Sequence, residues 1–320
     1  MVFLPVMTLL SIGDQVQQGD YLFHSRFARS IHFASNDRLV SLVDEGIGPG
    51  PLNIVFRDFS SEEVTSCRPA LRVGLNVVVF GSRRFRFTHN HCYRSNFEVD
   101  GWCPSRLCRQ LSVFEELLTG TSHPQSLSFL LDSRRLKNFQ SGVQRAFSKQ
   151  ILHGVQQVFS GNLLIGIRAL KGCGWGLTPS GDDFIAGLLI GLNLLQKMQH
   201  GDFQNAIDAI FTASLGDNLF SNTFLDLASR GLLSGRIKDL ISALMRGGEG
   251  AVRTSTEKLF AVGGTSGADL GTGFFMTVRD EGAADRRWGR PPKGRGSVEP
   301  FQRSRAAEIQ LKGDAEAFVL

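Results

Sequence analysis

The sequence predicts an α+β fold, in which a small all-β N-terminal domain (residues 1–104) precedes a mainly helical domain (residues 105–278) carrying two related glycine-rich loops. Two patterns predict this order. Between residues 21 and 99, short β-prone runs are separated by Gly, Pro and Asn, whereas beyond residue 104 apolar residues recur every three to four positions. A chain of 320 residues also has room for two domains of ordinary size.

The strands of the first domain are predicted at residues 39–43, 52–56, 75–80 and 85–87, where branched and aromatic side chains cluster. The turn at residues 46–51 lies between two of these strands. Gly permits positive φ there and Pro fixes φ, so we interpret the turn as a rigid hairpin loop in preference to a ligand-contacting loop.

The helices of the second domain are predicted from the three-to-four spacing of apolar residues. They cover residues 107–118, 126–131, 143–159, 184–198, 203–215, 220–233 and 237–245. The longest apolar run, residues 184–195, contains Gly and Asn and is too short to span a membrane. The sequence therefore predicts no membrane association.

The last segment, residues 279–320, is rich in Gly, Pro and charge and lacks an apolar period, so we predict a disordered tail. Residues 281–305 hold seven Lys/Arg against three Asp/Glu, which accounts for most of the net charge of +5. Because the rest of the chain is nearly balanced, we expect no folded basic face and no nucleic-acid partner.

The cysteine content and the N-terminus predict a cytoplasmic protein. Five cysteines are an odd number, which argues against a disulfide framework. The apolar run at residues 1–10 has no positive residue ahead of it and no clear cleavage site after it, so it does not resemble a secretory signal. Reduced thiols in the cytoplasm are the expected state.

The densest functional signal is the loop at residues 171–184, Lys-Gly-Cys-Gly-Trp-Gly-Leu-Thr-Pro-Ser-Gly-Asp-Asp-Phe. Alternate glycines let the backbone approach a ligand closely, and the hydroxyls of Thr178 and Ser180 come just before a predicted helix. A helix start attracts anions through its N–H groups and its dipole. Helix capping explains Ser180 and one Asp but not the other glycines or Thr178, so we favour a phosphate- or carboxylate-binding loop.

A second loop, at residues 263–273, repeats the first with one residue removed. Its Thr265, Ser266, Gly267, Asp269 and Gly273 correspond in order to Thr178, Ser180, Gly181, Asp183 and Gly187. Because the pattern occurs twice, we predict that both loops lie at helix N-termini and that their hydroxyls meet in one cleft.

The repeated carboxylates and hydroxyls are the predicted catalytic residues: Asp183, Asp269, Thr178 and Thr265. The predicted substrate- or anion-binding residues are Gly174, Gly176, Ser180, Gly181, Asp182, Gly263, Gly264, Ser266 and Gly267. Asp183 and Asp269 are also candidate metal ligands, with Mg²⁺ as the cofactor, because Mg²⁺ binds phosphate ligands through one or two carboxylates.

Other side chains fit a functional site less well. Residues 89–108 contain two His and three Cys without a standard zinc spacing. Cys173 lies near a helix start, which can lower a thiol pKa, but no His adjoins it in the sequence. Arg168 and Lys171 precede the first loop and could either neutralise an anion or be solvated charges. Asn222, Thr223 and Arg230 lie on a predicted helix between the loops and are candidates for the lining of the same cleft.

Residues 176–183 and 265–269 resemble the two signatures of a bacterial family that includes the AllH-type subunit of oxamate carbamoyltransferase, an enzyme of allantoin breakdown. The resemblance is specific from about residue 161 to residue 275. It implies a subunit that acts with two other proteins to interconvert oxalurate and phosphate with oxamate and carbamoyl phosphate. Many members of the family have His where this chain has Gly264.

Two functions fit these observations. The one we favour is a transferase subunit of purine catabolism, which handles small anionic metabolites together with partner subunits. The alternative is a non-catalytic anion-binding or regulatory subunit whose β-domain docks partners. An acid, base or nucleophile at the junction of the loops would distinguish the two, although such transfers can rest mainly on positioning and charge stabilisation.

Overall fold

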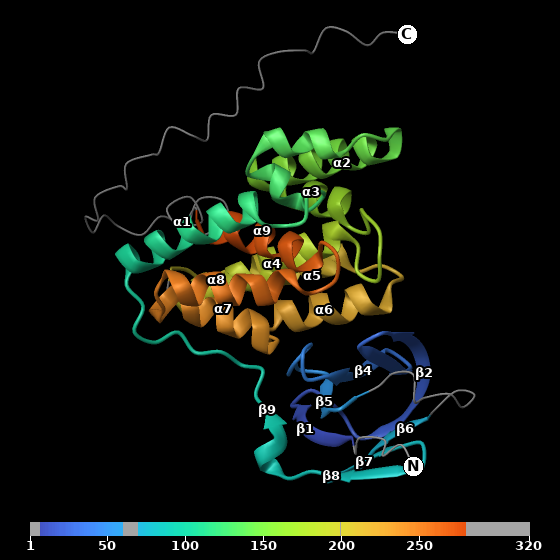
Figure 1. Ribbon diagram of the computed structural model, residues 1–320. Coiled ribbons are helices and arrows are strands. Elements are labelled where there is room, and N and C mark those ends of the chain that lie inside the picture. Colours follow the sequence, from blue (N-terminus) through green and yellow to red (C-terminus); the bar gives the residue numbers. More distant parts are fainter. Residues whose placement is uncertain (1–6, 60–69, 199, 280–320) are drawn as a thin grey trace, which may run out of the picture.

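The computed structural model describes residues 7–59, 70–198 and 200–279, and it confirms the α+β class. A curled N-terminal sheet lies against one side of a larger helical region, and an extended segment leads from the last strand to the first helix (Figure 1). The predicted tail lies outside the described residues, apart from Arg279.

The sheet contains nine strands within the described residues, in the order β8-β7-β6-β2-β3-β4-β5-β1-β9. The strands are β1 (Thr8–Gly13), β2 (Gly19–Phe27), β3 (Ser30–Ser35), β4 (Arg38–Asp44), β5 (Asn53–Arg57), β6 (Leu71–Val73), β7 (Val77–Phe80), β8 (Arg83–Arg86) and β9 (Cys92–Tyr93). All neighbours pair antiparallel except β4 with β5 and β1 with β9. The apolar run near the N-terminus thus ends in strand β1, which pairs with β5.

The segment at residues 46–51 is not a hairpin loop, because β4 and β5, which it connects, run parallel. It instead contacts the helical region. The backbone N–H of Gly235 donates to the carbonyl oxygen of Pro49 at 2.9 Å, and the guanidinium of Arg236 donates to the carbonyl oxygens of Ile47 and Gly46. The segment therefore joins the two regions of the molecule.

The helical region agrees with most of the predicted helices. Its helices are α1 (Pro104–Gly120), α2 (Gly142–Phe159), α3 (Leu163–Leu170), α4 (Ser180–Lys197), α5 (Gln204–Ser214), α6 (Leu219–Ser229), α7 (Gly235–Arg246), α8 (Glu249–Phe260) and α9 (Ser266–Val278), with short 3-10 turns η1 (His89–His91), η2 (Leu127–Leu130) and η3 (Ser133–Asn138). The predicted helix at residues 126–131 is only the turn η2, and α3 and α8 were not predicted. No helix in the described ranges is both long and apolar enough to cross a membrane.

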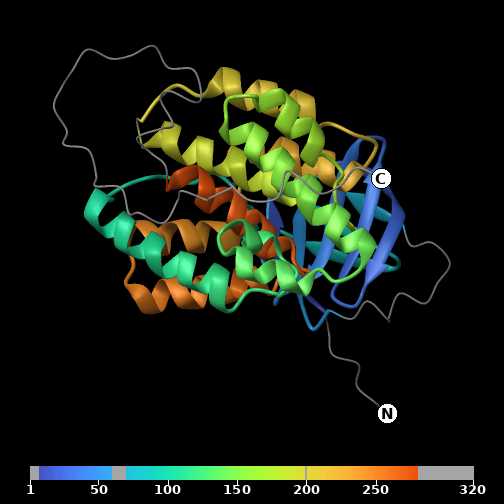
Figure 2. The same ribbon diagram turned by 90° about the horizontal axis from the view of Figure 1, so that it is seen from above.

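Helices α4 and α9 form the centre of this region, with the other helices packed around them (Figure 2). Every residue of α4 from Ser180 to Leu195 is buried. A Cβ at Gly187 would lie 2.0 Å from the carbonyl oxygen of Leu270, and a Cβ at Gly273 would lie 2.2 Å from that of Phe184. The two helices therefore touch backbone to backbone through a matched pair of glycines, which places their N-termini side by side.

Candidate functional site

The first loop reaches α4 by a path that depends on glycine. Gly174 has φ of +125°, and a Cβ there would lie 2.7 Å from the backbone nitrogen of Ser180, so a side chain is excluded both by conformation and by space. Gly176 also has a positive φ, +100°. The amide of Asn218 fixes the loop by donating to the carbonyl oxygen of Leu177 at 2.9 Å.

The glycines that open the two helices occupy matched positions. A Cβ at Gly181 would lie 1.9 Å from the carbonyl oxygen of Leu170, and a Cβ at Gly267 would lie 1.9 Å from that of Leu259. These two glycines allow each helix start to pack on the preceding helix. Close packing is therefore sufficient to explain them, whether or not a ligand also approaches.

The two loops meet, as the repeat predicted. The hydroxyl oxygens of Thr178 and Ser266 lie 3.4 Å apart, although the residues are 88 positions apart in the sequence. The hydroxyls of Ser266 and Thr178 both approach the carboxylate of Asp183. In the same way, the hydroxyls of Ser180 and Thr265 approach the carboxylate of Asp269.

This arrangement is a crossed pairing: each carboxylate contacts the Thr of its own loop and the Ser of the opposite loop. Neither serine caps its helix, because neither helix start has a side-chain cap. The geometry therefore gives the hydroxyls a role across the two loops that capping does not explain.

Both carboxylates are buried, and burial dominates their electrostatics. Burial raises the pKa of Asp183 well above its usual range, the nearby charge of Asp269 raises it further, and the two hydroxyls oppose the shift. Burial raises the pKa of Asp269 to about 7, against a backbone hydrogen bond and two hydroxyls that lower it. The Oδ2 atoms of both residues are buried without a hydrogen-bond partner.

The second carboxylate has a support that sequence reasoning missed. The backbone N–H of Leu127, in η2, donates to Oδ1 of Asp269 at 2.6 Å. The flanking hydroxyls of Ser122, Ser126 and Ser128 form a buried triangle with oxygen separations of 2.7–2.9 Å. The serines of this segment are a weak sequence signal, and the spacing of its apolar residues predicted a helix instead.

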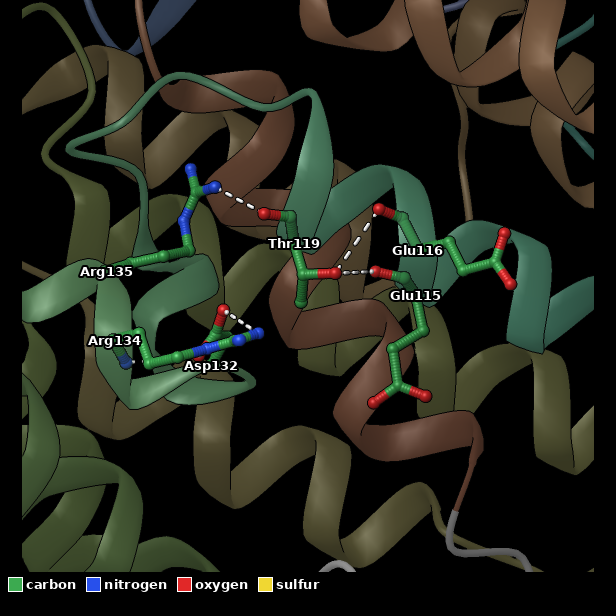
Figure 3. A network of polar contacts seen from close by, with 6 residues as sticks. All are labelled: Glu115, Glu116, Thr119, Asp132, Arg134 and Arg135. Carbon is green, nitrogen blue, oxygen red and sulfur yellow. Dashed lines mark hydrogen bonds and ion pairs between the residues drawn. The ribbon is translucent and has the colours of Figure 1, made fainter.

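Arg135 fixes this serine cluster to the end of α1. Its guanidinium donates to the carbonyl oxygens of Thr119 at 2.6 Å, Ser122 at 3.0 Å and His123 at 2.7 Å, and to the hydroxyl of Ser122 at 2.9 Å. Figure 3 shows the contact between Arg135 and Thr119. Asp269 is thus backed by a rigid element.

The N–H groups at the helix starts, which we predicted as an anion cradle, are largely used by the chain itself. Gly181 donates to the carbonyl oxygen of Cys173 at 2.8 Å, Asp183 to that of Pro179 at 3.0 Å, and Gly267 to that of Val262 at 3.2 Å. The donors that face the carboxylates are instead the hydroxyls. Thr178, Thr265 and Ser266 lie closer to solvent than the two acids, and we call these three residues the surface layer of the site.

The other predicted residues are distributed differently. Asp182 turns away from the pair, because its Oδ1 accepts from the backbone N–H of Gly172 at 2.7 Å. Gly176, Gly263 and Gly264 are exposed. Burial and the charge of Asp182 raise the pKa of Cys173, so the thiol is not activated as a nucleophile.

The polar residues outside the loops have structural partners. Lys171 donates to the carbonyl oxygen of Leu215, and Asn222 exchanges two hydrogen bonds with the backbone of Gly216. Thr223 bonds within its own helix. Arg230 bonds Asp226 and reaches Gln15 of the β-domain, so it belongs to the contact between the two regions.

No group of three or more His, Cys, Asp or Glu side chains is placed to hold a metal ion in the part of the chain that the structure describes. The His and Cys residues between positions 89 and 108 therefore do not gather as zinc ligands. Asp183 and Asp269 are two carboxylates with four hydroxyls around them, an all-oxygen environment.

Comparison with known proteins connects this site to a family. No curated protein and no solved structure matches the chain. Residues 170–278 match the family model described as oxamate carbamoyltransferase subunit AllH. This range begins just before the first loop and ends with α9, so it contains both loops and the helix crossing. Residues 170–278 are therefore similar to the AllH family.

Proposed function

We propose that this chain is a subunit of a carbamoyl-transferring enzyme of the oxamate carbamoyltransferase type, and that the crossed pairing of α4 and α9 is its substrate site. The single observation that carries the proposal is that the two loops of the matched region meet and exchange hydroxyl contacts with two buried carboxylates. A structural helix crossing needs the glycines but does not need either acid.

The surface layer of hydroxyls suits the chemistry of the substrates. In the proposed reaction, an oxygen of phosphate bonds to the carbamoyl carbon of oxalurate. The bond from that carbon to nitrogen breaks, and the departing oxamate nitrogen gains a proton. Each hydroxyl of Thr178, Thr265 and Ser266 has one proton to donate. When substrate binds, these hydroxyls would turn from the carboxylates to the carbamoyl and phosphate oxygens on which negative charge develops. Holding both reactants in line supplies much of the rate.

Partner subunits would complete this site. Gly264 is exposed and, with open space around it, carries no imidazole. The proton that the departing nitrogen requires would then come from a group on another subunit or from solvent. The alternative is a non-catalytic subunit that binds the same metabolites. The glycine at position 264 favours this alternative, because it leaves the surface layer without an acid or base of its own.

The test is an assay of the reconstituted complex with Thr178→Val and Thr265→Val, each of which replaces a hydroxyl by a methyl group of similar shape. Each should lower kcat/KM for carbamoyl phosphate formation from oxalurate and phosphate by about tenfold or more, as expected for a lost hydrogen bond to a charged group. Thr223→Val is the matched control, because the Thr223 hydroxyl bonds within its own helix. Unchanged kcat/KM in both loop variants would refute a substrate role for the surface layer.

A further inference from the structure

We propose that the crossed pairing is a binding site for one divalent, oxygen-preferring cation, with Mg²⁺ as the favoured ion, held between Asp183 and Asp269. The use of this cation in catalysis rests on the proposed function, but the cation site itself does not. The argument depends on the burial of the two acids, on their unpartnered oxygens and on the chemistry of the surrounding donors.

The first step concerns charge. Asp269 is 0% exposed and Asp183 is 9% exposed. Buried charges in proteins are normally paired or coordinate metals. Within the described ranges, no Lys, Arg or His forms an ion pair with either carboxylate or contributes to its electrostatics. The positive partner that such a pair requires is therefore not a side chain of the described residues.

The second step concerns the atoms that such a partner would contact. One oxygen of Asp269 is used by Leu127, whereas Oδ2 of Asp269 and Oδ2 of Asp183 are buried and make no hydrogen bond. Leaving two buried acceptors unpartnered costs free energy, because buried polar groups in folded proteins are normally paired. One cation between the two oxygens would satisfy both.

The third step identifies the ion. The side chains around the carboxylates are the hydroxyls of Thr178, Ser180, Thr265 and Ser266, so the donor set contains oxygen alone. Zn²⁺ and Cu²⁺ favour nitrogen or sulfur ligands, and Ca²⁺ takes six to eight oxygens. Mg²⁺ typically uses one or two carboxylates and keeps its other positions for water and phosphate oxygens. Two acids beneath a partly open hydroxyl layer match that preference.

The cation would also remove a conflict in the proposed function. Every substrate of the reaction is an anion, and two ionised acids beneath the surface layer would repel it. A bound Mg²⁺ would neutralise the acids and give the phosphate oxygens a positive partner. The competing account is that the two acids simply share a proton and bind no ion.

The experiment is a titration of the full chain with Mn²⁺, an EPR-active substitute for Mg²⁺, at about pH 8. The wild-type chain should bind one Mn²⁺ tightly, with competition by Mg²⁺. Asp183→Asn and Asp269→Asn should each weaken this binding at least tenfold. Glu116→Gln is the control, because Glu116 lies in a surface hollow where three acids, Glu116 itself with Glu115 and Asp132, face one basic residue, Arg134, and could collect cations without specificity (Figure 3).

Absence of a tightly bound Mn²⁺ in the wild-type chain would overturn the proposal. So would a loss of Mn²⁺ affinity in Glu116→Gln as large as that in the two Asn variants. Retention of tight binding in both Asn variants would do the same. Melting curves in EDTA identify a variant that has lost its fold. In that case Ser266→Ala, which removes one hydroxyl beside Asp183, replaces that variant and should weaken Mn²⁺ binding measurably. The titration contains no substrate, so a failed carbamoyl transfer assay would not affect its result. A failed Mn²⁺ titration would likewise not decide the outcome of the transfer assay.

Discussion

The two loops are alike in sequence and in pairing, but they differ in how their carboxylates are supported. Asp183 is reached by two hydroxyls, whereas Asp269 is reached by two hydroxyls and by the backbone N–H of Leu127. Asp269 is fully buried behind η2, and Asp183 retains 9% exposure. A duplicated motif has thus been built into two unequal halves, one fixed by a rigid backbone donor and one held by side chains alone.

This difference teaches that a repeat in the sequence reports shared geometry but not shared environment. The matched glycines give both helices the same crossing, and the matched Thr and Ser give both acids the same hydroxyls. The third element, η2, comes from a distant part of the chain and donates to the Asp269 half. The predictions below test whether the two halves act as one site and how far they differ.

The largest expected effect is on activity. Asp183→Asn and Asp269→Asn should each lower turnover in the reconstituted complex by about a hundredfold or more, because each removes a buried charge that the proposed site uses. The fold should remain, since Asn has nearly the same volume as Asp and its amide oxygen at position 269 can still accept from the backbone N–H of Leu127. Activity close to wild type in either variant, with unchanged melting curves, would remove that carboxylate from the mechanism.

A second effect concerns pH and stability in EDTA. The pKa of Asp269 is about 7 in the folded chain against 3.8 in the unfolded chain, so the folded state binds this proton more tightly. The stability that the protonated Asp269 contributes to the folded state is fully present below pH 3.8 and is lost as the pH rises through about 7. The loss should amount to at most about 4 kcal/mol at 1.4 kcal/mol per pKa unit. Denaturant titrations at several pH values in this window should show that the unfolding free energy depends less on pH in Asp269→Asn than in the wild-type chain. An equal dependence on pH in the two chains would contradict the raised pKa of Asp269.

The third prediction concerns the shared crossing. Gly187→Ala and Gly273→Ala should each lower the free energy of unfolding by about 1–3 kcal/mol, because the new Cβ meets a backbone carbonyl that cannot move without separating α4 from α9. Gly250→Ala on α8 is the control, since nothing lies within 4 Å of its added Cβ. A cost at only one of the two glycines would show that the crossing is less symmetric than the contacts indicate.

The fourth prediction addresses the unequal half. Arg135→Met should destabilise the chain by about 2 kcal/mol, because it removes donors from the part-buried carbonyl groups of Thr119 and Ser122. Hydrogen exchange should then show faster exchange of the Leu127 amide, which donates to Asp269. The Gly172 amide, which donates to Asp182, should be unaffected. If both amides lose protection together, Arg135 supports the whole fold rather than the Asp269 half.

The sequence predicted those features that depend on local patterns. Strands such as β4 and helices such as α2 and α4 follow from periodicity, and the meeting of the loops follows from their repeat. The parallel pairing of β4 with β5 could not be read from the turn residues at 46–51, because Gly and Pro are equally compatible with a connection that docks on α7. Local chemistry predicted the turn but not its partner.

The candidate site shows the same limit. The pattern of Thr, Ser and Asp identified the residues that come together, but it did not predict the contacts between the hydroxyls and the carboxylates. It also predicted that the helix N–H groups face a ligand. Those N–H groups are used by carbonyl oxygens of Cys173, Pro179 and Val262 that sequence alone does not place. The donor from Leu127 depends on the packing of η2, for which no motif exists.

The crossed pairing is the central claim, and a double-mutant cycle on unfolding free energy in EDTA tests it most directly. Ser266→Ala combined with Asp183→Asn should show a coupling of about 0.5–1 kcal/mol, as contacting residues do, and Ser180→Ala with Asp269→Asn should behave alike. The same-loop combinations, Ser266→Ala with Asp269→Asn and Ser180→Ala with Asp183→Asn, should be additive within about 0.3 kcal/mol. Coupling confined to the same-loop pairs, with additivity across the loops, would contradict the account and reduce the two motifs to separate helix starts.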